Sequence, residues 1–94
     1  GRRAREGPVT VTHLPDESNP PRVAYAVGRQ VGPAVVRNRV RRRLRAIIED
    51  LAGPDGQLPA GPGAYLVSTR PAAAGLSYDE LHTAVSTAMR RLAG

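Results

Sequence analysis

The sequence predicts an α+β domain in which helices pack on one face of a small sheet. Short segments with alternating apolar residues, typical of strands, precede and separate two longer segments with apolar residues at helical spacing. Glycine and proline clusters stand between these segments, so the predicted order is strand, strand, helix, strand, helix. A length of 94 residues suits one domain with its own core, and we expect 1–94 to form a single unit.

The first two strands are predicted over 8–14 (PVTVTHL) and 22–27 (RVAYAV), on either side of the breaker-rich loop 15–21. We expect them to be antiparallel neighbours. Each strand places bulky residues, Tyr25 among them, on a face suited to a core. Small or hydroxylated residues occupy the other face, which stays open to another molecule and comprises Thr10, Thr12, Ala24 and Ala26.

A long central helix is predicted from Pro33, as its first residue, to about Leu51, just before the breaker sequence GPDG. Its apolar residues fall within an arc of roughly a third of a turn, and this stripe must face the sheet. The stripe comprises Val36, Val40, Leu44, Ile47, Ile48 and Leu51.

A third strand is predicted over 64–69 (AYLVST), and a second helix after Ser77. Ser77 and Glu80 have the spacing of a capping box, and Asp79 and Glu80 suit the positive end of a helix. The apolar stripe of this helix is predicted to contain Tyr78, Leu81, Val85, Ala88, Met89 and Leu92.

Composition excludes several classes of protein. The chain has no cysteine, which excludes disulfides and thiolate zinc sites. It has no secretory signal and no apolar run of membrane-spanning length, so we expect a cytoplasmic protein with no membrane partner. Because the first residue is Gly1 rather than methionine, we expect part of the N-terminus to be absent.

Motifs that carry catalysis are also absent. The glycines at 28 and 32 lack the spacing of a P-loop, and no G-x-G-x-x-G occurs. His13 falls on a predicted strand and His82 on a predicted helix, without a paired carboxylate pattern, so we expect structural or surface roles for both. We therefore expect no catalytic residue and no metal ligand in this chain.

The stretch Val36–Arg45 (VRNRVRRRLR) holds six arginines, and no acidic residue occurs from Val36 to Ile48. A helix face that is merely solvated normally mixes charges of both signs. All 14 basic residues are arginine, whose planar guanidinium matches phosphate, and the net charge is +6. The pattern predicts binding of a nucleic acid. Along one border of the apolar stripe, an i, i+4, i+8 row is formed by Arg37, Arg41 and Arg45.

The segment 22–48 (RVAYAVGRQVGPAVVRNRVRRRLRAII) resembles the signature of the bacterial ribonuclease P protein family. In that signature a strand, a basic turn, V-G-x-A-V and an Arg-Asn-Arg element follow one another at this spacing. GRRAREG, PVTVTHL, AYLVSTRP and SYDELHTAVSTAMRRL resemble further strands and the last helix of the family, so the resemblance covers the whole chain. The family normally begins with a helix that is not found here, and the turn reads Arg29-Gln30 where two basic residues are usual.

The resemblance implies the protein subunit of a ribonucleoprotein endonuclease that removes the 5′ leader from precursor tRNA. In this family the RNA subunit performs the chemistry with magnesium, while the protein binds the RNA subunit and the leader. The resemblance also implies a mixed sheet with a left-handed βαβ crossover, an exception to the usual handedness.

Carried over to this chain, the resemblance implies a leader cleft between the open sheet face and the central helix. Thr12 stands where the family usually has an aromatic residue, which would weaken base stacking. The cleft floor would include Thr10, Thr12, Ala24 and Ala26, and its wall Arg37, Asn38, Arg41 and Arg45. Contacts to the RNA subunit would fall to Arg29, Arg39, Arg42 and Arg43. Either further phosphate contacts or a flexible basic terminus would come from Arg2, Arg3 and Arg5.

The residues alone leave other functions open. An RNA-binding module of ribosomal-protein type, without a role in cleavage, would carry a similar basic helix, and so would a DNA-binding helix protein. An intrinsic nuclease would cleave RNA without any RNA subunit. Affinity for polyanions does not separate these alternatives, whereas accurate removal of a tRNA leader in the presence of ribonuclease P RNA does.

Overall fold

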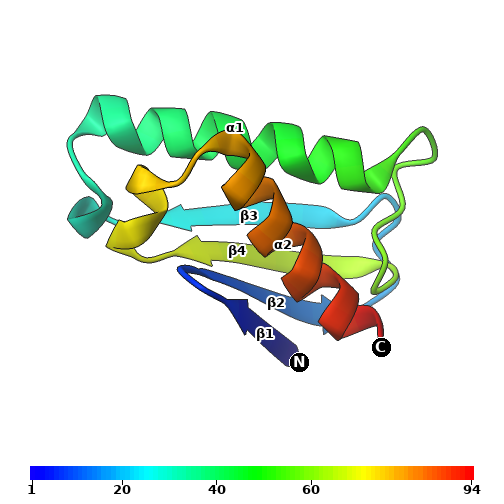
Figure 1. Cartoon of the computed structure of the whole chain (residues 1–94). Helices are drawn as coiled ribbons and strands as arrows, with labels where there is room; N and C mark the ends of the chain where they lie inside the picture. The colour runs from blue at the N-terminus through cyan, green and yellow to red at the C-terminus, as the bar shows by residue number, and fades with distance from the viewer.

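The computed structural model describes all 94 residues as one four-stranded sheet with two long helices (Figure 1). Every predicted strand and helix is present, with ends within one or two residues of those predicted. The first strand, β1, is additional to the predicted order and was implied only by the resemblance. In chain order these are β1 (Arg2–Glu6), β2 (Val9–Pro15), β3 (Arg22–Val27), α1 (Ala34–Ala52), β4 (Gly63–Thr69) and α2 (Tyr78–Ala93). Two short 3₁₀ helices, η1 (Arg29–Val31) and η2 (Pro71–Gly75), precede the long helices and were not predicted.

The strand order in the sheet is β1-β2-β4-β3. β2 pairs antiparallel with β1 and with β4, whereas β3 and β4 are parallel. The prediction that β2 and β3 are neighbours is wrong, because β4 lies between them. Alternation along a strand determines which face is buried, but it carries no information about which other strand supplies the hydrogen bonds.

The connection from β3 through α1 to β4 is a left-handed crossover, as the resemblance implied. Both helices contribute to the same core, so both lie on one side of the sheet. When that side faces the viewer and the parallel strands point upward, β4 lies to the left of β3 (Figure 1). Crossovers of this hand are rare, because the twist of strands and helices favours the opposite one.

The hydrophobic core lies between the sheet and the two helices. α2 crosses the sheet over β1 and β2, while α1 runs beside β3 and contacts α2 (Figure 1). Tyr25 is half-buried against this core, as predicted. Neither long helix is long and apolar enough to cross a membrane. The predicted stripe of α1 is confirmed, with Val40, Leu44, Ile47 and Ile48 buried and Val36 and Leu51 half-buried.

The two helices begin differently. Pro33 is the N-cap of α1, one position earlier than the first helical residue it was predicted to be, and no side chain caps this helix. α2 begins with the predicted capping box, in which the Glu80 N–H donates to Ser77 Oγ at 3.1 Å and the Ser77 N–H donates to Glu80 Oε1 at 2.9 Å. The predicted stripe of α2 is buried except for Tyr78, which is 38% exposed because it is the first residue of the helix.

Candidate nucleic-acid interface

The face of the sheet opposite the helices is open, and it carries all four predicted floor residues. Ala24 and Ala26 are exposed, and Thr10 and Thr12 are half-buried. Strand register arranges the face in two rows across β2, β4 and β3. One row contains Thr12, Leu66 and Ala24, and the other contains Thr10, Ser68 and Ala26.

The open face also carries Leu66 and Ser68 of β4, which were not predicted from the sequence. Leu66 is 41% exposed, and Leu14, on the same face of β2, is 56% exposed. The alternation in AYLVST could have predicted this placement, because Tyr65 and Val67 face the core and Leu66 and Ser68 therefore face the other side. The open face is therefore more apolar than predicted, and it presents Leu66 rather than an aromatic ring.

The predicted arginine row follows β3, which is an edge strand of the sheet. Arg41 donates to the carbonyl oxygen of Val27 at 3.4 Å and to Asn38 Oδ1 at 3.1 Å. The guanidinium of Arg45 lies 5.9 Å from the centroid of the Tyr25 ring, within the range of a cation–π interaction. Burial raises the pKa of Tyr25 above its ordinary value. These contacts place Arg41 and Arg45 beside β3, at the edge of the sheet.

The residues predicted to contact an RNA subunit are not equivalent. Arg29, Arg39 and Arg42 are exposed and make no side-chain hydrogen bond within the chain. Arg43 is half-buried and donates to the carbonyl oxygen of Leu76 at 3.2 Å, which joins α1 to the segment before α2. Part of the hydrogen-bonding capacity of Arg43 is therefore used by the fold, which its place in the arginine run did not show.

No arginine of α1 forms an ion pair. The nitrogen Nε of Arg37 is buried without a hydrogen-bond partner, so this arginine also lacks an acceptor at that position. The three ion pairs of the chain all lie elsewhere: Arg22 with Asp16, His82 with Asp50, and Arg91 with Glu6.

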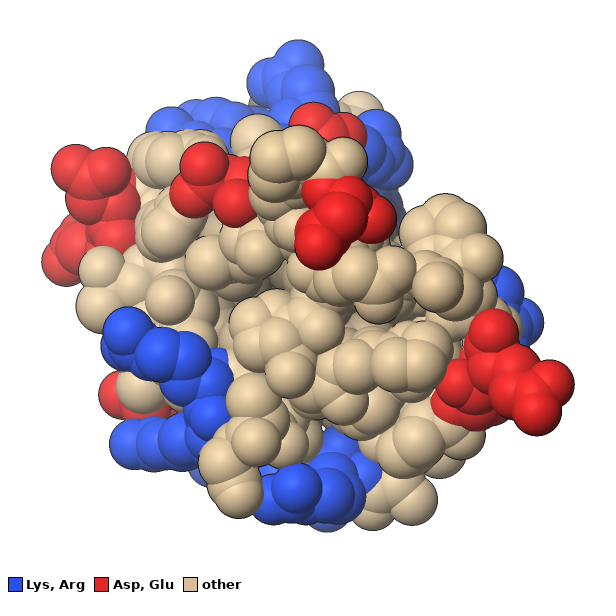
Figure 2. Space-filling model, turned by 90° about the vertical axis from the view of Figure 1, so that its right-hand side faces the viewer, with Lys and Arg blue, Asp and Glu red and all other residues tan.

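Acidic residues concentrate at the end of the molecule where α1 stops and the chain enters loops. Figure 2 views this end, with acidic groups spread over a largely uncharged surface and arginines toward the margins. Asp16 and Glu17 directly follow β2, Glu49 and Asp50 lie in the last turn of α1, and Asp55 follows α1. Within α1 itself, both acids, Glu49 and Asp50, come after the last arginine, Arg45.

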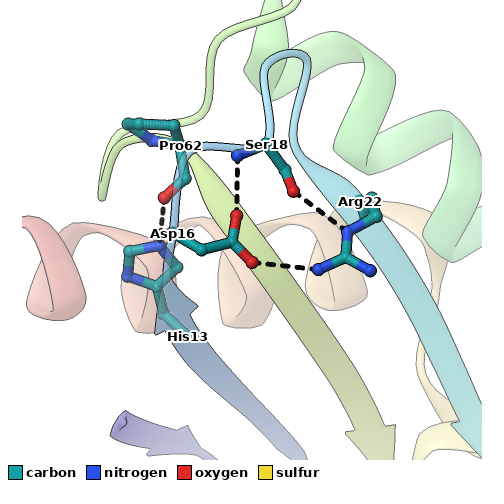
Figure 3. Close-up of polar contacts among 5 residues, drawn as sticks. All are labelled: His13, Asp16, Ser18, Arg22 and Pro62. Atoms are coloured by element: carbon teal, nitrogen blue, oxygen red, sulfur yellow. Dashed lines mark hydrogen bonds and ion pairs between the residues drawn. The ribbon is translucent and has the colours of Figure 1, made fainter.

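Both histidines hold parts of the fold together. His13 is buried, stacks on Tyr65 with ring centroids 4.4 Å apart, and places Nε2 3.0 Å from the carbonyl oxygen of Pro62 (Figure 3). His82 Nε2 lies 2.8 Å from Asp50 Oδ2, which corrects the prediction that it has no paired carboxylate. The two residues are 32 positions apart on different helices, so sequence spacing could not reveal the pair.

Polar contacts of Asp16 hold the loop after β2 together. The N–H of Ser18 donates to Asp16 Oδ1 at 2.7 Å, and Arg22 pairs with Asp16 Oδ2 at 2.9 Å (Figure 3). These contacts, with Ser18 first and Arg22 after it, lower the pKa of Asp16. No group of three or more His, Asp or Glu side chains gathers where it could hold a metal ion.

Fold and surface define a small α+β protein in which an acid-free arginine helix runs beside an open sheet face. The family model described as Ribonuclease P matches residues 1–93, and the chain belongs to this family. It is 40% identical over 98 aligned residues to the ribonuclease P protein component of Thermobifida fusca, covering 96% of this chain and 64% of that protein. It is 38% identical to the corresponding protein of Streptomyces avermitilis, covering 90% of this chain and 67% of that protein.

The fold agrees with solved structures of the same family. The RNase P protein of Staphylococcus aureus superposes with a TM-score of 0.83 at 16% identity, over 97% of this chain and 80% of that one. The RNase P protein of Thermotoga maritima gives 0.82 at 18% identity, over 100% of this chain and 86% of that one. The chain spans about two thirds of the length of the curated relatives, between 64% and 68% for the first four.

Proposed function

We propose that this chain is the protein subunit of ribonuclease P in a bacterial cytoplasm, where it assists removal of the 5′ leader from precursor tRNA. One observation carries the proposal beyond family membership: six arginines project from α1 without a single ion pair to an acid of the chain. Like charges held this close destabilise an isolated helix, whereas phosphates bound to them would supply the missing counter-charge.

Two sides of α1 serve two partners in this proposal. On the side of β3, the row that includes Arg41 and Arg45 borders the open sheet face, which suits an extended single strand such as the leader. Elsewhere on the helix surface, Arg39 and Arg42 are exposed and unengaged, which suits phosphates of a folded RNA subunit. Arg29 adds an exposed charge near the start of α1. Arg43 also contributes, although, like Arg41, it donates to a backbone carbonyl oxygen of the chain.

The chemistry in this proposal belongs to the RNA subunit and its magnesium ions. The side chains of this protein offer no cluster of oxygen ligands for a divalent cation, and its histidines are engaged in the core and in a contact between helices. The contribution of the protein is to bind both RNAs and to neutralise phosphate charge, so that substrate and metal ions are held at lower magnesium concentrations.

Reconstitution tests the proposal. The chain is mixed with a bacterial ribonuclease P RNA and a precursor tRNA in low magnesium, and the products are mapped at nucleotide resolution. We expect accurate cleavage at the leader junction only when protein and RNA are both present. Cleavage by the chain alone would indicate an intrinsic nuclease. RNA binding with no stimulation of accurate cleavage would instead support the RNA-binding module of ribosomal-protein type.

A further inference from the structure

A second group of arginines lies at the opposite edge of the open face from α1. Arg3, Arg5 and Arg70, together with Thr10, line a hollow with a volume of about 380 Å³. No acidic and no apolar side chain lines it. This hollow was not visible in the sequence, because it brings together residues from β1, β2 and the segment after β4.

Strand alternation separates the arginines of β1 into two sets. Ala4 packs against the core, so Arg3 and Arg5 point to the open face, where they stand beside Thr12 and Thr10 on β2. Arg2 lies on the other side and donates to the carbonyl oxygen of Leu92 at 3.1 Å. Arg3 and Arg5 are therefore part of an ordered strand, and the flexible basic terminus considered from the sequence is not found.

The hollow holds three positive charges with almost no compensation. Arg3 and Arg70 make no side-chain hydrogen bond or ion pair within the chain, and Arg5 donates only to the carbonyl oxygen of Gly7, at 3.3 Å. The one acid on β1, Glu6, is paired with Arg91 at 2.8 Å. Three guanidinium groups and a hydroxyl around one polar hollow match the donor set that binds a phosphate.

The main chain holds the hollow in place. The N–H of Arg70 donates to the carbonyl oxygen of Pro8 at 2.8 Å, which attaches the end of β4 to the start of β2. Arg5 pairs with Thr10 in the β1–β2 ladder, and Ser68 pairs with Thr10 from the other side. The hollow and the floor of the open face therefore share Thr10 and cannot move independently.

We propose that this hollow binds a backbone phosphate of the single-stranded 5′ leader, so that the leader crosses the sheet from the α1 row to the β1 edge. The inference rests on the proposed function and specifies its binding site. The β1 and β3 strands are three strand spacings apart, about 14 Å, so a strand of several nucleotides reaches from one border to the other. A base is a poorer occupant than a phosphate, because the lining has no apolar or aromatic side chain to stack on it.

The face on which the hollow opens favours the leader over the RNA subunit as its ligand. The hollow opens on the same face as the floor and shares Thr10 with it. The exposed residues Arg39 and Arg42 project from α1, which lies along the opposite border of the sheet. An RNA subunit bound at those arginines leaves the β1 edge accessible to a leader that lies on the open face.

The test uses the full chain assembled with ribonuclease P RNA and measures affinity for precursor tRNAs with leaders of increasing length and for mature tRNA. The affinity of the free chain for ribonuclease P RNA is measured separately. The variants are Arg3→Gln, Arg70→Gln and their combination. The matched control is Arg90→Gln, which removes the same charge from an exposed site on α2, across the sheet from the hollow. Thermal unfolding of each free protein verifies that the variants fold.

We expect each single variant to weaken binding of the long-leader substrate about fivefold, with the slope of log affinity against log salt reduced by about 0.7 for each lost contact. Binding of mature tRNA and of substrates with the shortest leaders should not change, and Arg90→Gln should have no effect. Loss of affinity for the RNA subunit or for mature tRNA to the same extent would assign the hollow to another RNA and overturn the inference. Unchanged binding in every assay would overturn it as well, leaving the proposed function intact if the parent chain still prefers precursor tRNA. Absence of that preference in the parent chain would instead count against the proposed function itself.

Discussion

The two long helices of this chain are built on opposite principles. α2 has a capping box, Asp79 and Glu80 in its first turn, and Arg90 and Arg91 in its last turn, which complements the helix dipole at both ends. α1 has no side-chain cap, no acid in its first turn and no basic residue in its last turn. Its acids, Glu49 and Asp50, lie near the C-terminal end, where the dipole disfavours them.

The two helices differ in whether their surface charges stabilise the helix. The ends of α2 follow the rules that stabilise a helix, so its charges are explained by folding. α1 is held by its buried stripe, which includes Leu44 and Ile47 at 0% exposure, and its charges run against helix stability. Charge that makes no contact within the chain is available for a partner, and on α1 this applies above all to Arg39 and Arg42.

Salt should produce the largest effect. With about six arginine–phosphate contacts, affinity for the RNA subunit should fall roughly a thousandfold or more between about 50 and 200 mM salt. Stability of the free protein should rise only slightly over the same range, because salt screens the repulsion among the arginines of α1, which form no ion pair for it to weaken. Titrations at four or more salt concentrations measure the slope. A nearly flat slope would mean that the charge of α1 is not used for binding.

Substitution of the two sides of α1 should divide its functions. Arg41→Ala with Arg45→Ala should weaken binding of precursor tRNA about tenfold or more, and that of mature tRNA much less, because only the precursor has a leader to contact them. Arg39→Ala with Arg42→Ala should mainly weaken assembly with the RNA subunit. The second pair avoids Arg43, which also supports the fold through Leu76. Equal losses from both pairs in both assays would show that the sides are not specialised.

The cap of α2 should affect folding alone. Ser77→Ala removes the hydroxyl that accepts from the Glu80 N–H and should lower the free energy of unfolding by about 1 kcal/mol. The matched control is Ser86→Ala, the same chemical change inside α2, where alanine favours the helix. Urea denaturation measures both variants. RNA affinity should be unchanged under conditions where both proteins are folded, and a large loss of affinity would contradict the division between the helices.

The smallest expected effect is the pH dependence of α2. Hydrogen bonds from the backbone and then the side chain of Ser77 lower the pKa of Glu80 below its ordinary value. A carboxylate whose pKa is lower in the folded state contributes stability above its unfolded pKa, and this contribution is lost as the pH falls through the folded pKa. Urea midpoints between about pH 7 and 3 should therefore fall less for Glu80→Gln, which keeps an acceptor without the titration.

Asp16 titrates in the same direction, because its pKa is also lowered, and it supplies the control for that measurement. Asp16→Asn should reduce the acid-range dependence by a separate amount, since the loop after β2 and the start of α2 share no contact among these residues. A pH dependence that neither substitution reduces would show that other carboxylates, outside these two local structures, control acid unfolding.

Much of this protein could be predicted from local patterns. Alternation over 22–27 located β3 to the residue, and the SYDE motif located the cap of α2, because both patterns act within a few residues of chain. The sharing of one sheet face by the four predicted floor residues was also predicted correctly, since the strand period determines which side chains share a face. The binding roles of these residues and of the arginine row stay predictions.

Tertiary structure decided what depends on partners distant in sequence. β4 entered the sheet between β2 and β3, which no alternation pattern specifies, and so added Leu66 and Ser68 to the floor. Arg43 contacts Leu76, and His82 contacts Asp50, because the packing of the helices brings these distant residues together. The hollow at the β1 edge is the clearest case, because hydrogen-bonded strand pairing brings Arg5 and Arg70 together. The free energy that stabilises this pairing comes from burying the opposite face of the same strands.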